Sequence, residues 1–166
     1  MPILKGGRLI MFNSEREMQD TFVSLLKQRK TCGLIFEEVG NRNFFFRTDV
    51  AEYKDRLNII GYELKLKDFH NLIEQTLYTI NLYDKNYMVI PEDKLESLLK
   101  ATKFCKDNRI KKVGIITVSK NGYKIVKQAI KDNTRDYNDK YNSTLVQDLI
   151  IRGYYKDGCN RMKKYI

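Results

Sequence analysis

The sequence predicts an α/β fold in which a mixed central β-sheet is flanked by helices. Segments with helical apolar spacing alternate with short apolar strands, short turns join the first three strands, and helices separate the later ones. An antiparallel meander should therefore come first and crossover connections second. The 166 residues suit one compact core over residues 1–126, followed by a helical, basic C-terminal extension over residues 127–166.

The first helix is expected over residues 14–27. Ser14 can act as the N-cap, and Glu17 three residues later completes a capping box. An apolar stripe at helical spacing is formed by Met18, Phe22, Leu25 and Leu26. Glu15 lies at the N-terminal end of this stripe, where a carboxylate either complements the helix dipole or serves a site on the core side.

The next three strands are expected at 32–39, 44–49 and 57–66, with a turn at 40–43 and a looser stretch at 52–56. Side chains alternate between the two faces of a strand. In the third strand this alternation buries Leu64 and places Glu63 and Lys65 together on the opposite face.

The second half of the chain continues with alternating helices and strands. Helices are expected at 68–83 and 92–106, strands at 86–90, 112–118 and 123–126, and an Asn-Gly hairpin turn at 119–122. Asp68 caps the first of these helices, and Pro91 opens the second. In the extension we expect a helix at 141–152 and a basic end that contains Arg161, Lys163 and Lys164.

The composition favours a polyanionic partner. The formal net charge is +10, which indicates either nucleic-acid binding or a merely soluble surface. Three dispersed cysteines and a single histidine argue against a zinc site and a disulfide framework. No apolar run approaches the roughly 18 residues of a membrane span. We expect a cytoplasmic protein with no membrane partner and no organic cofactor.

Two acids and a lysine carry the chemistry that this sequence suggests. Asp49 ends one strand, and Glu63 and Lys65 follow on the next as Glu-x-Lys. Hard carboxylate oxygens suit Mg²⁺ or Mn²⁺, and such a cation can activate a water and neutralise charge on a phosphate. The bland alternative is an ordinary turn aspartate and a solvated Glu/Lys strand face.

The order of these motifs resembles the PD-(D/E)xK nuclease superfamily, which has the restriction-endonuclease-like fold. The family pattern is a helix with an acid, a strand meander with an aspartate, Glu-x-Lys on the next strand, and a helix that often bears a glutamine. Glu15, Asp49, Glu63, Lys65 and Gln75 match it in order. The first helix, SEREMQDTFVSLL, is similar to the opening helix of archaeal Holliday-junction resolvases. Thr48 stands where many members have a proline.

The resemblance implies a role for each matching residue. Asp49 and Glu63 would bind the metal, Mg²⁺ or Mn²⁺, together with the Leu64 carbonyl. Lys65 would act on the attacking water. Glu15 would bind a second metal or its water shell. Gln75 would orient Lys65 or contact the scissile phosphate, unless it is a plain surface residue.

Three functions remain open at this stage. The first is a Mg²⁺-dependent endonuclease that cuts DNA, either branched or junction DNA or a duplex in restriction or repair. The second is an inactive nucleic-acid-binding module of the same fold, and the third is an interaction protein with structural Glu63 and Lys65. The apolar stripe of Leu145, Val146, Leu149 and Ile150 either packs on its own domain or forms a homodimer surface, as in symmetric resolvases.

Overall fold

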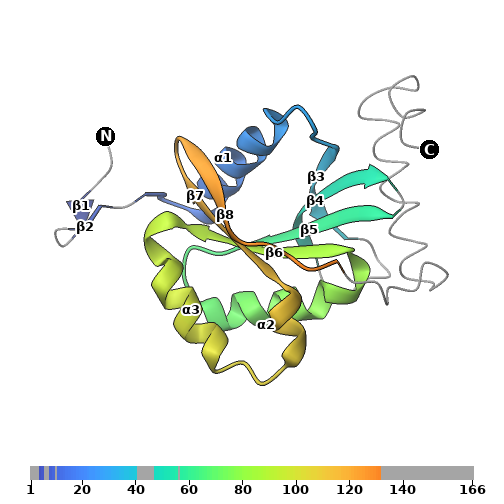
Figure 1. Cartoon of the computed structure of the whole chain (residues 1–166). Coiled ribbons are helices and arrows are strands. Elements are labelled where there is room, and N and C mark those ends of the chain that lie inside the picture. Colours follow the sequence, from blue (N-terminus) through green and yellow to red (C-terminus); the bar gives the residue numbers. More distant parts are fainter. Residues whose placement is uncertain (1–3, 6–7, 10, 41–46, 56, 132–166) are drawn as a thin grey trace.

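A six-stranded mixed sheet between helices forms the core of the protein, as a computed structural model shows (Figure 1). The structure describes residues 4–5, 8–9, 11–40, 47–55 and 57–131. The helix expected at 141–152, the basic end and the apolar stripe of the extension lie outside these residues, as does the turn at 41–43. The predicted α/β class with a mixed central sheet is confirmed.

The strand order is β3-β4-β5-β6-β7-β8. The six strands are β3 Leu34–Val39, β4 Thr48–Asp55, β5 Asn58–Leu64, β6 Lys85–Pro91, β7 Gly114–Ser119 and β8 Gly122–Lys127. β3, β4 and β5 pair antiparallel, β5, β6 and β7 pair parallel, and β8 returns antiparallel to β7. The expected meander followed by crossovers is therefore what the chain forms. A separate two-stranded ladder joins β1 Leu4–Lys5 to β2 Arg8–Leu9.

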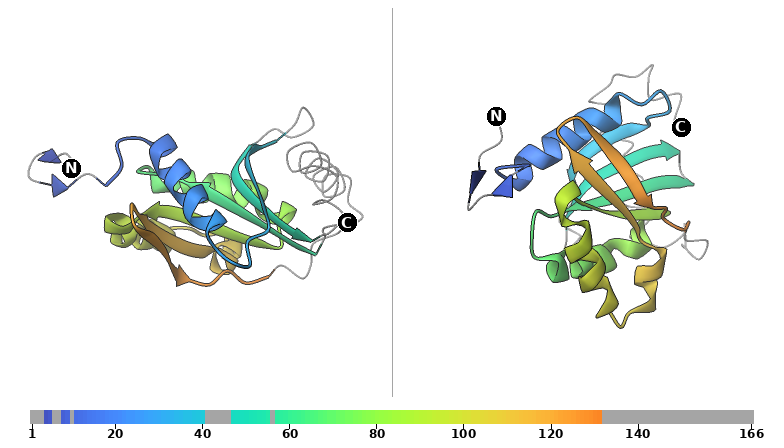
Figure 2. Two further views of the ribbon diagram at one scale, coloured as in Figure 1. Left: turned by 90° about the horizontal axis from the view of Figure 1, so that it is seen from above. Right: turned by 60° about the vertical axis from the view of Figure 1, so that its left-hand side comes forward.

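Helix α1, Glu15–Lys27, covers one face of the sheet (Figures 1 and 2). Its N-terminus has the expected cap: the Glu17 N–H donates to Ser14 Oγ at 3.0 Å, and Glu17 Oε2 accepts from the Asn13 N–H at 2.8 Å. Such a cap contributes about 1 kcal/mol. Phe22 then packs edge-on against Tyr62 of β5 and Tyr123 of β8, with ring centroids 5.2 and 5.7 Å apart. These contacts fix the helix across the middle of the sheet.

Helices α2, Phe69–Thr79, and α3, Leu95–Lys103, cover the opposite face (Figures 1 and 2). Short 3₁₀ segments adjoin them, namely η1 Ile80–Leu82, η2 Glu92–Lys94 and η3 Asn108–Lys112. Both helices are thus shorter than the sequence suggests. Pro91 ends β6 and is also the N-cap of η2, so it stands one residue before the first helical position, and its φ of −60° suits both roles.

One strand assignment from the sequence is wrong. The second strand was expected at 44–49 with a looser stretch at 52–56. Residues 44–46 and 56 lie outside the described residues, and β4 runs from Thr48 through most of the supposed looser stretch to Asp55. Glu52, placed in the looser stretch, is fully buried within the strand. Polar residues there obscured the strand because their burial depends on partners that lie far away in sequence. At the other end, Ala129 is buried and the Ile130 N–H donates to the Lys112 carbonyl, so the chain stays on the core there.

No helix in the described part of the chain combines the length and the apolar composition that a bilayer span requires.

Gly61 of β5 provides a test of the packing beneath α2. A Cβ at this position would lie 2.5 Å from Cδ2 of the buried Tyr83. We expect Gly61→Ala to destabilise the fold by about 1–3 kcal/mol through overpacking. Gly122→Ala is the matched control because nothing lies within 4 Å of its Cβ position. Urea unfolding measures both, and equal midpoints for the two variants would contradict this packing.

Candidate active site

The sheet opens between β4 and β5 at Asp49. The ladder between these strands has its last pair at Val50 and Tyr62, while Thr48 still pairs with Val39 of β3. Beyond that pair, the Leu64 N–H donates to Asp49 Oδ2 at 2.9 Å, so a side chain replaces the backbone acceptor. This bond holds the Asp49 carboxylate beside β5, next to Glu63.

Glu63 is buried without full compensation. It is 3% exposed, and its Oε1 has no hydrogen-bond partner among the described residues. Burial above all, then the charge of Asp49 and a hydrogen bond with it, raises the pKa of Glu63 well above its usual range. Burial also raises the pKa of Asp49, although the Leu64 N–H opposes that effect. Of the two acids, Glu63 therefore binds a proton more tightly.

Lys65 and Glu15 complete one side of this pair. Lys65 Nζ lies 3.7 Å from Glu15 Oε1, which joins the end of β5 to the first turn of α1. The charge of Lys65 lowers the pKa of Glu63, and that of Glu15 raises the pKa of Asp49. The structure thus brings together Glu15, Asp49, Glu63 and Lys65, four of the residues that the sequence motif selected.

Glu38 is a further acid at the site, and the sequence motif did not include it. Its charge raises the pKa of both Asp49 and Glu63. Its backbone is left-handed, with φ of 52°, a conformation that costs a non-glycine residue about 1 kcal/mol. Gln19 of α1 donates to it at 3.3 Å, and Arg47 lies 3.6 Å away. The Glu-Glu pair that precedes the turn to Asp49 was the signal available in the sequence.

Two predicted roles, that of the Gln75 side chain and that of the Leu64 carbonyl, are not supported by any contact at this cluster. Gln75 is exposed on α2, and no interaction within the described residues links its side chain to the four motif residues. The Leu64 side chain is buried in the core as expected, and its N–H serves Asp49. The metal-binding role of the Leu64 carbonyl and the role of Gln75 stay predictions.

The donor set fits a hard divalent cation of the Mg²⁺ type. Over the described ranges, no three His, Cys, Asp or Glu side chains gather into a complete cation site. Mg²⁺ does not require one, because it is commonly held by one or two carboxylates with water and substrate phosphate as the other ligands. Asp49 and Glu63 supply two carboxylates, and the unpartnered Glu63 Oε1 is an oxygen that a cation would satisfy.

Glu52 shows what a buried carboxylate looks like when protein groups satisfy it. It is fully buried and accepts from Arg29 at 2.7 Å, from Tyr62 Oη at 2.8 Å and from the Gly33 N–H at 3.0 Å. Arg29 follows α1, so this bridge pins the end of that helix to β4. The same core therefore contains one satisfied carboxylate, Glu52, and one unsatisfied carboxylate, Glu63.

The chain shows little similarity to known proteins. No family model matches it, and no curated protein matches it significantly. Among solved structures it is similar to the SPO1766 protein of unknown function from Silicibacter pomeroyi. That match has 14% identity, covers 75% of this chain and 80% of that chain, and has a TM-score of 0.49. It carries no inference about activity, which has to be judged from the site itself.

The two buried carboxylates predict opposite effects of an isosteric change. A carboxyl with a raised folded-state pKa binds its proton more tightly in the fold, so stability falls as pH rises from its unfolded value through its folded value. Glu63→Gln should therefore stabilise the metal-free protein at pH 8, by on the order of 1–3 kcal/mol, and flatten this decline. Thermal unfolding in EDTA from pH 4 to pH 9 measures the effect.

Glu52→Gln is the matched comparison. Because it leaves the half-buried Arg29 guanidinium without its counter-charge, we expect a loss of about 2 kcal/mol at pH 8. If both variants were destabilised alike in EDTA, Glu63 would be a satisfied structural residue like Glu52.

Proposed function

We propose that this protein is a Mg²⁺-dependent phosphodiesterase that cuts DNA, with a site of the PD-(D/E)xK type. The observation that carries the proposal is the pair of the half-buried Asp49 and the buried Glu63, whose Oε1 has no hydrogen-bond partner among the described residues. Burying two acids together is costly unless something of opposite charge compensates them. A site that binds a divalent cation accounts for this cost.

Asp49 and Glu63 are the residues that would hold the cation. When bound, the cation would lower the pKa of a coordinated water and neutralise charge on the phosphate. Asp49 is already oriented for this role, because the Leu64 N–H donates to its carboxylate and fixes it in place. Glu63 would release its proton on binding, so cation affinity should increase with pH.

Lys65 is placed to act on the reacting groups. Its side chain is 19% exposed, and its ion-pair partner Glu15, 3.7 Å away, restricts its position. A fixed ammonium group can orient a water and stabilise the charge that develops on a phosphate. Glu15 itself is half-exposed and belongs to the motif as the acid that positions Lys65.

DNA as the substrate is supported by the distribution of charge. Residues 11–98 carry 12 Lys and Arg against 15 Asp and Glu, a net charge of −3. Residues 99–131 carry 10 Lys and Arg against one Asp, a net charge of +9. A basic segment beside an acidic cluster provides phosphate contacts without neutralising the acids that would hold the cation.

A second candidate is nucleic-acid binding without cleavage. The observation that favours it is this same separation of charge, because the basic segment could bind nucleic acid without any of the four motif residues. The two candidates differ in whether the acids bind a cation at all.

Cleavage of DNA by purified protein tests the first candidate. We expect Mg²⁺- or Mn²⁺-dependent nicking that EDTA abolishes and that Asp49→Asn, Glu63→Gln and Lys65→Ala each reduce by at least about 100-fold. Lys27→Ala, at the exposed end of α1, is the control for loss of a lysine and should retain activity. A panel of duplex, single-stranded, flap and four-way-junction DNA and RNA identifies the substrate.

Activity that persists in the Glu63→Gln and Lys65→Ala proteins would overturn the mechanism. In that case the cleavage would come from another site or from a contaminant.

Cation binding can be measured without any substrate. Mn²⁺ at 100 times its dissociation constant should stabilise the protein by about 2.7 kcal/mol. Calorimetric titration should show one site that Asp49→Asn removes and that Glu38→Gln merely weakens. Absence of binding at pH 8, with the protein folded, would favour the second candidate.

A further inference from the structure

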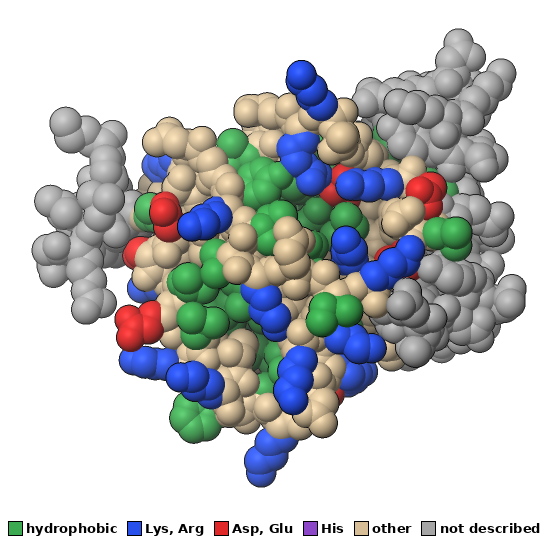
Figure 3. Space-filling view, in the orientation of Figure 1, with side chains coloured by type: hydrophobic (Ala, Val, Ile, Leu, Met, Phe, Trp, Pro, Cys, Tyr) green, Lys and Arg blue, Asp and Glu red, His purple; other side chains and the backbone are tan. Residues whose placement is uncertain are grey.

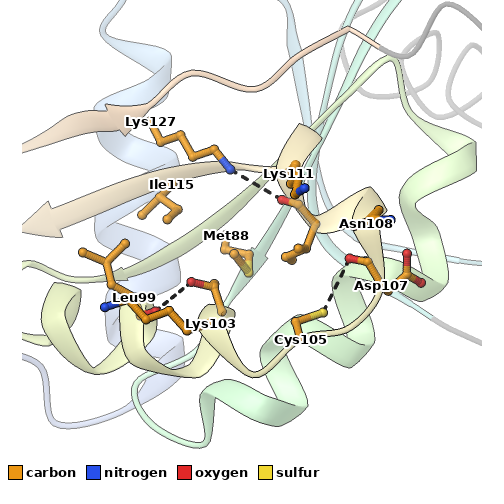
Figure 4. Close-up of a pocket in the computed structure, with 11 residues that line it drawn as sticks. Met88, Leu99, Lys103, Cys105, Asp107, Asn108, Lys111, Ile115 and Lys127 are labelled. Atoms are coloured by element: carbon orange, nitrogen blue, oxygen red, sulfur yellow. Dashed lines mark hydrogen bonds between the residues drawn. The ribbon is translucent and has the colours of Figure 1, made fainter.

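A pocket of about 350 Å³ lies between α3, η3 and the sheet (Figure 4). Leu99 and Lys103 approach it from α3, Met88 and Ile115 from β6 and β7, and Lys127 from β8. None of the four motif residues of the candidate active site lines it. The pocket therefore needs an explanation of its own.

The pocket has an apolar floor and a cationic rim. Met88 and Ile115 are buried in the floor, and Leu99, which is 42% exposed, extends the apolar surface outward. Lys103, Lys111 and Lys127 stand around it (Figure 4). A planar apolar ring fits such a floor, and an anion fits such a rim.

The lysines of the rim lack acidic partners. Among the described residues, no carboxylate lies within ion-pair distance of Lys103, Lys111 or Lys127. Lys127 Nζ donates to the Ile110 carbonyl at 3.5 Å, and partial burial lowers the pKa of Lys127. Its ammonium group would therefore gain from a bound anion.

The one acid in this segment is already neutralised. Both Asp107 carboxylate oxygens accept from Arg109, Oδ1 from Nε at 3.1 Å and Oδ2 from Nη2 at 2.7 Å. Residues 99–131 otherwise contain only basic side chains among their charged residues. Figure 3 shows Lys and Arg side chains around apolar ones over much of this face.

We propose that this pocket binds one nucleotide, with the base against Met88, Leu99 and Ile115 and the phosphate between the lysines. The proposal extends the function proposed above, for which the partner is DNA, by giving nucleic acid a second point of attachment outside the four motif residues. The volume is at the lower end of the range for ligand pockets, about 300–1,000 Å³, which suits a single nucleotide and excludes a base pair.

The sheet register connects this pocket to the candidate active site. Glu63 of β5 pairs with Met88 of β6, and Met88 pairs with Ile115 of β7, so the pocket floor lies in the same row of the sheet as Glu63. Lys127 and Lys124 of β8 face Ile115 and Thr117 in the register, on the pocket side of the sheet. A single strand held at the pocket could follow this row to the acids.

Binding of small probes in EDTA tests the pocket without any cleavage. Deoxyadenosine monophosphate, deoxyadenosine and inorganic phosphate would be titrated into the full chain, with amide shifts of Met88, Leu99 and Ile115 followed by NMR. We expect saturable shifts with the nucleotide, at least about fivefold tighter than with either fragment alone. Equal affinity for phosphate and nucleotide, or no shift at these amides, would overturn the proposal.

Two double variants separate the pocket from general charge. Lys103→Gln/Lys111→Gln should weaken nucleotide binding about fivefold or more. Lys27→Gln/Lys30→Gln removes the same charge from exposed positions around the end of α1 and should change it less than twofold. Leu99→Asp should also abolish the nucleotide-induced amide shifts, because it places a carboxylate in the apolar surface that would contact the base. Equal effects of the two double variants would overturn the site.

A single-stranded oligonucleotide distinguishes a free nucleotide from one within a strand. If the natural ligand is a strand, the oligonucleotide binds more tightly than the mononucleotide and also shifts the Lys124 amide. The Lys103→Gln/Lys111→Gln variant then lowers the slope of affinity against salt by about 0.7 per lost phosphate contact. If the natural ligand is a free nucleotide, the mononucleotide binds at least as tightly as the oligonucleotide. These measurements in EDTA require no cleavage, and the Lys103→Gln/Lys111→Gln variant keeps all four motif residues, so failure of the pocket and failure of cleavage are separate outcomes.

Discussion

The departure of β4 from β5 at Asp49 is the constraint on which the candidate site depends. A continuous ladder would have paired the two backbones, whereas here the Asp49 carboxylate takes the Leu64 N–H and stays inside the fold next to Glu63. The surrounding elements then follow. Lys65 leaves the strand on the side of α1, and the capped start of that helix places Glu15 against it.

The contrast between Glu52 and Glu63 distinguishes a buried carboxylate that protein donors satisfy from one that they do not. Both carboxylates are buried in neighbouring strands of one sheet, at 0% and 3% exposure. Three donors surround Glu52, which makes it part of the bracing of α1. Glu63 keeps an unpartnered oxygen and a raised pKa, a cost to stability without a structural return. Such a cost is typical of residues that are kept for binding or chemistry.

Periodicity in the sequence was enough to predict the α/β class, the meander and the burial of Leu64, since these follow from local alternation. The motif also named four residues that the fold brings together. It did not reveal Glu38, whose contribution depends on a left-handed backbone and on the register opposite Asp49. Glu52 was missed for the same reason, because its partner Arg29 is 23 residues away. Gln75 shows the converse, a motif match with an exposed side chain.

The unequal division of charge along the chain, −3 over residues 11–98 and +9 over residues 99–131, also gives this part of the molecule an electric dipole. Its positive end lies with α3, η3 and β8. In the field of a polyanion such a molecule would experience a torque as well as an attraction, so its orientation would be set before contact. Most productive encounters would then begin with the lysine face, and the acids would meet the backbone only after contact has displaced the ions that screen it.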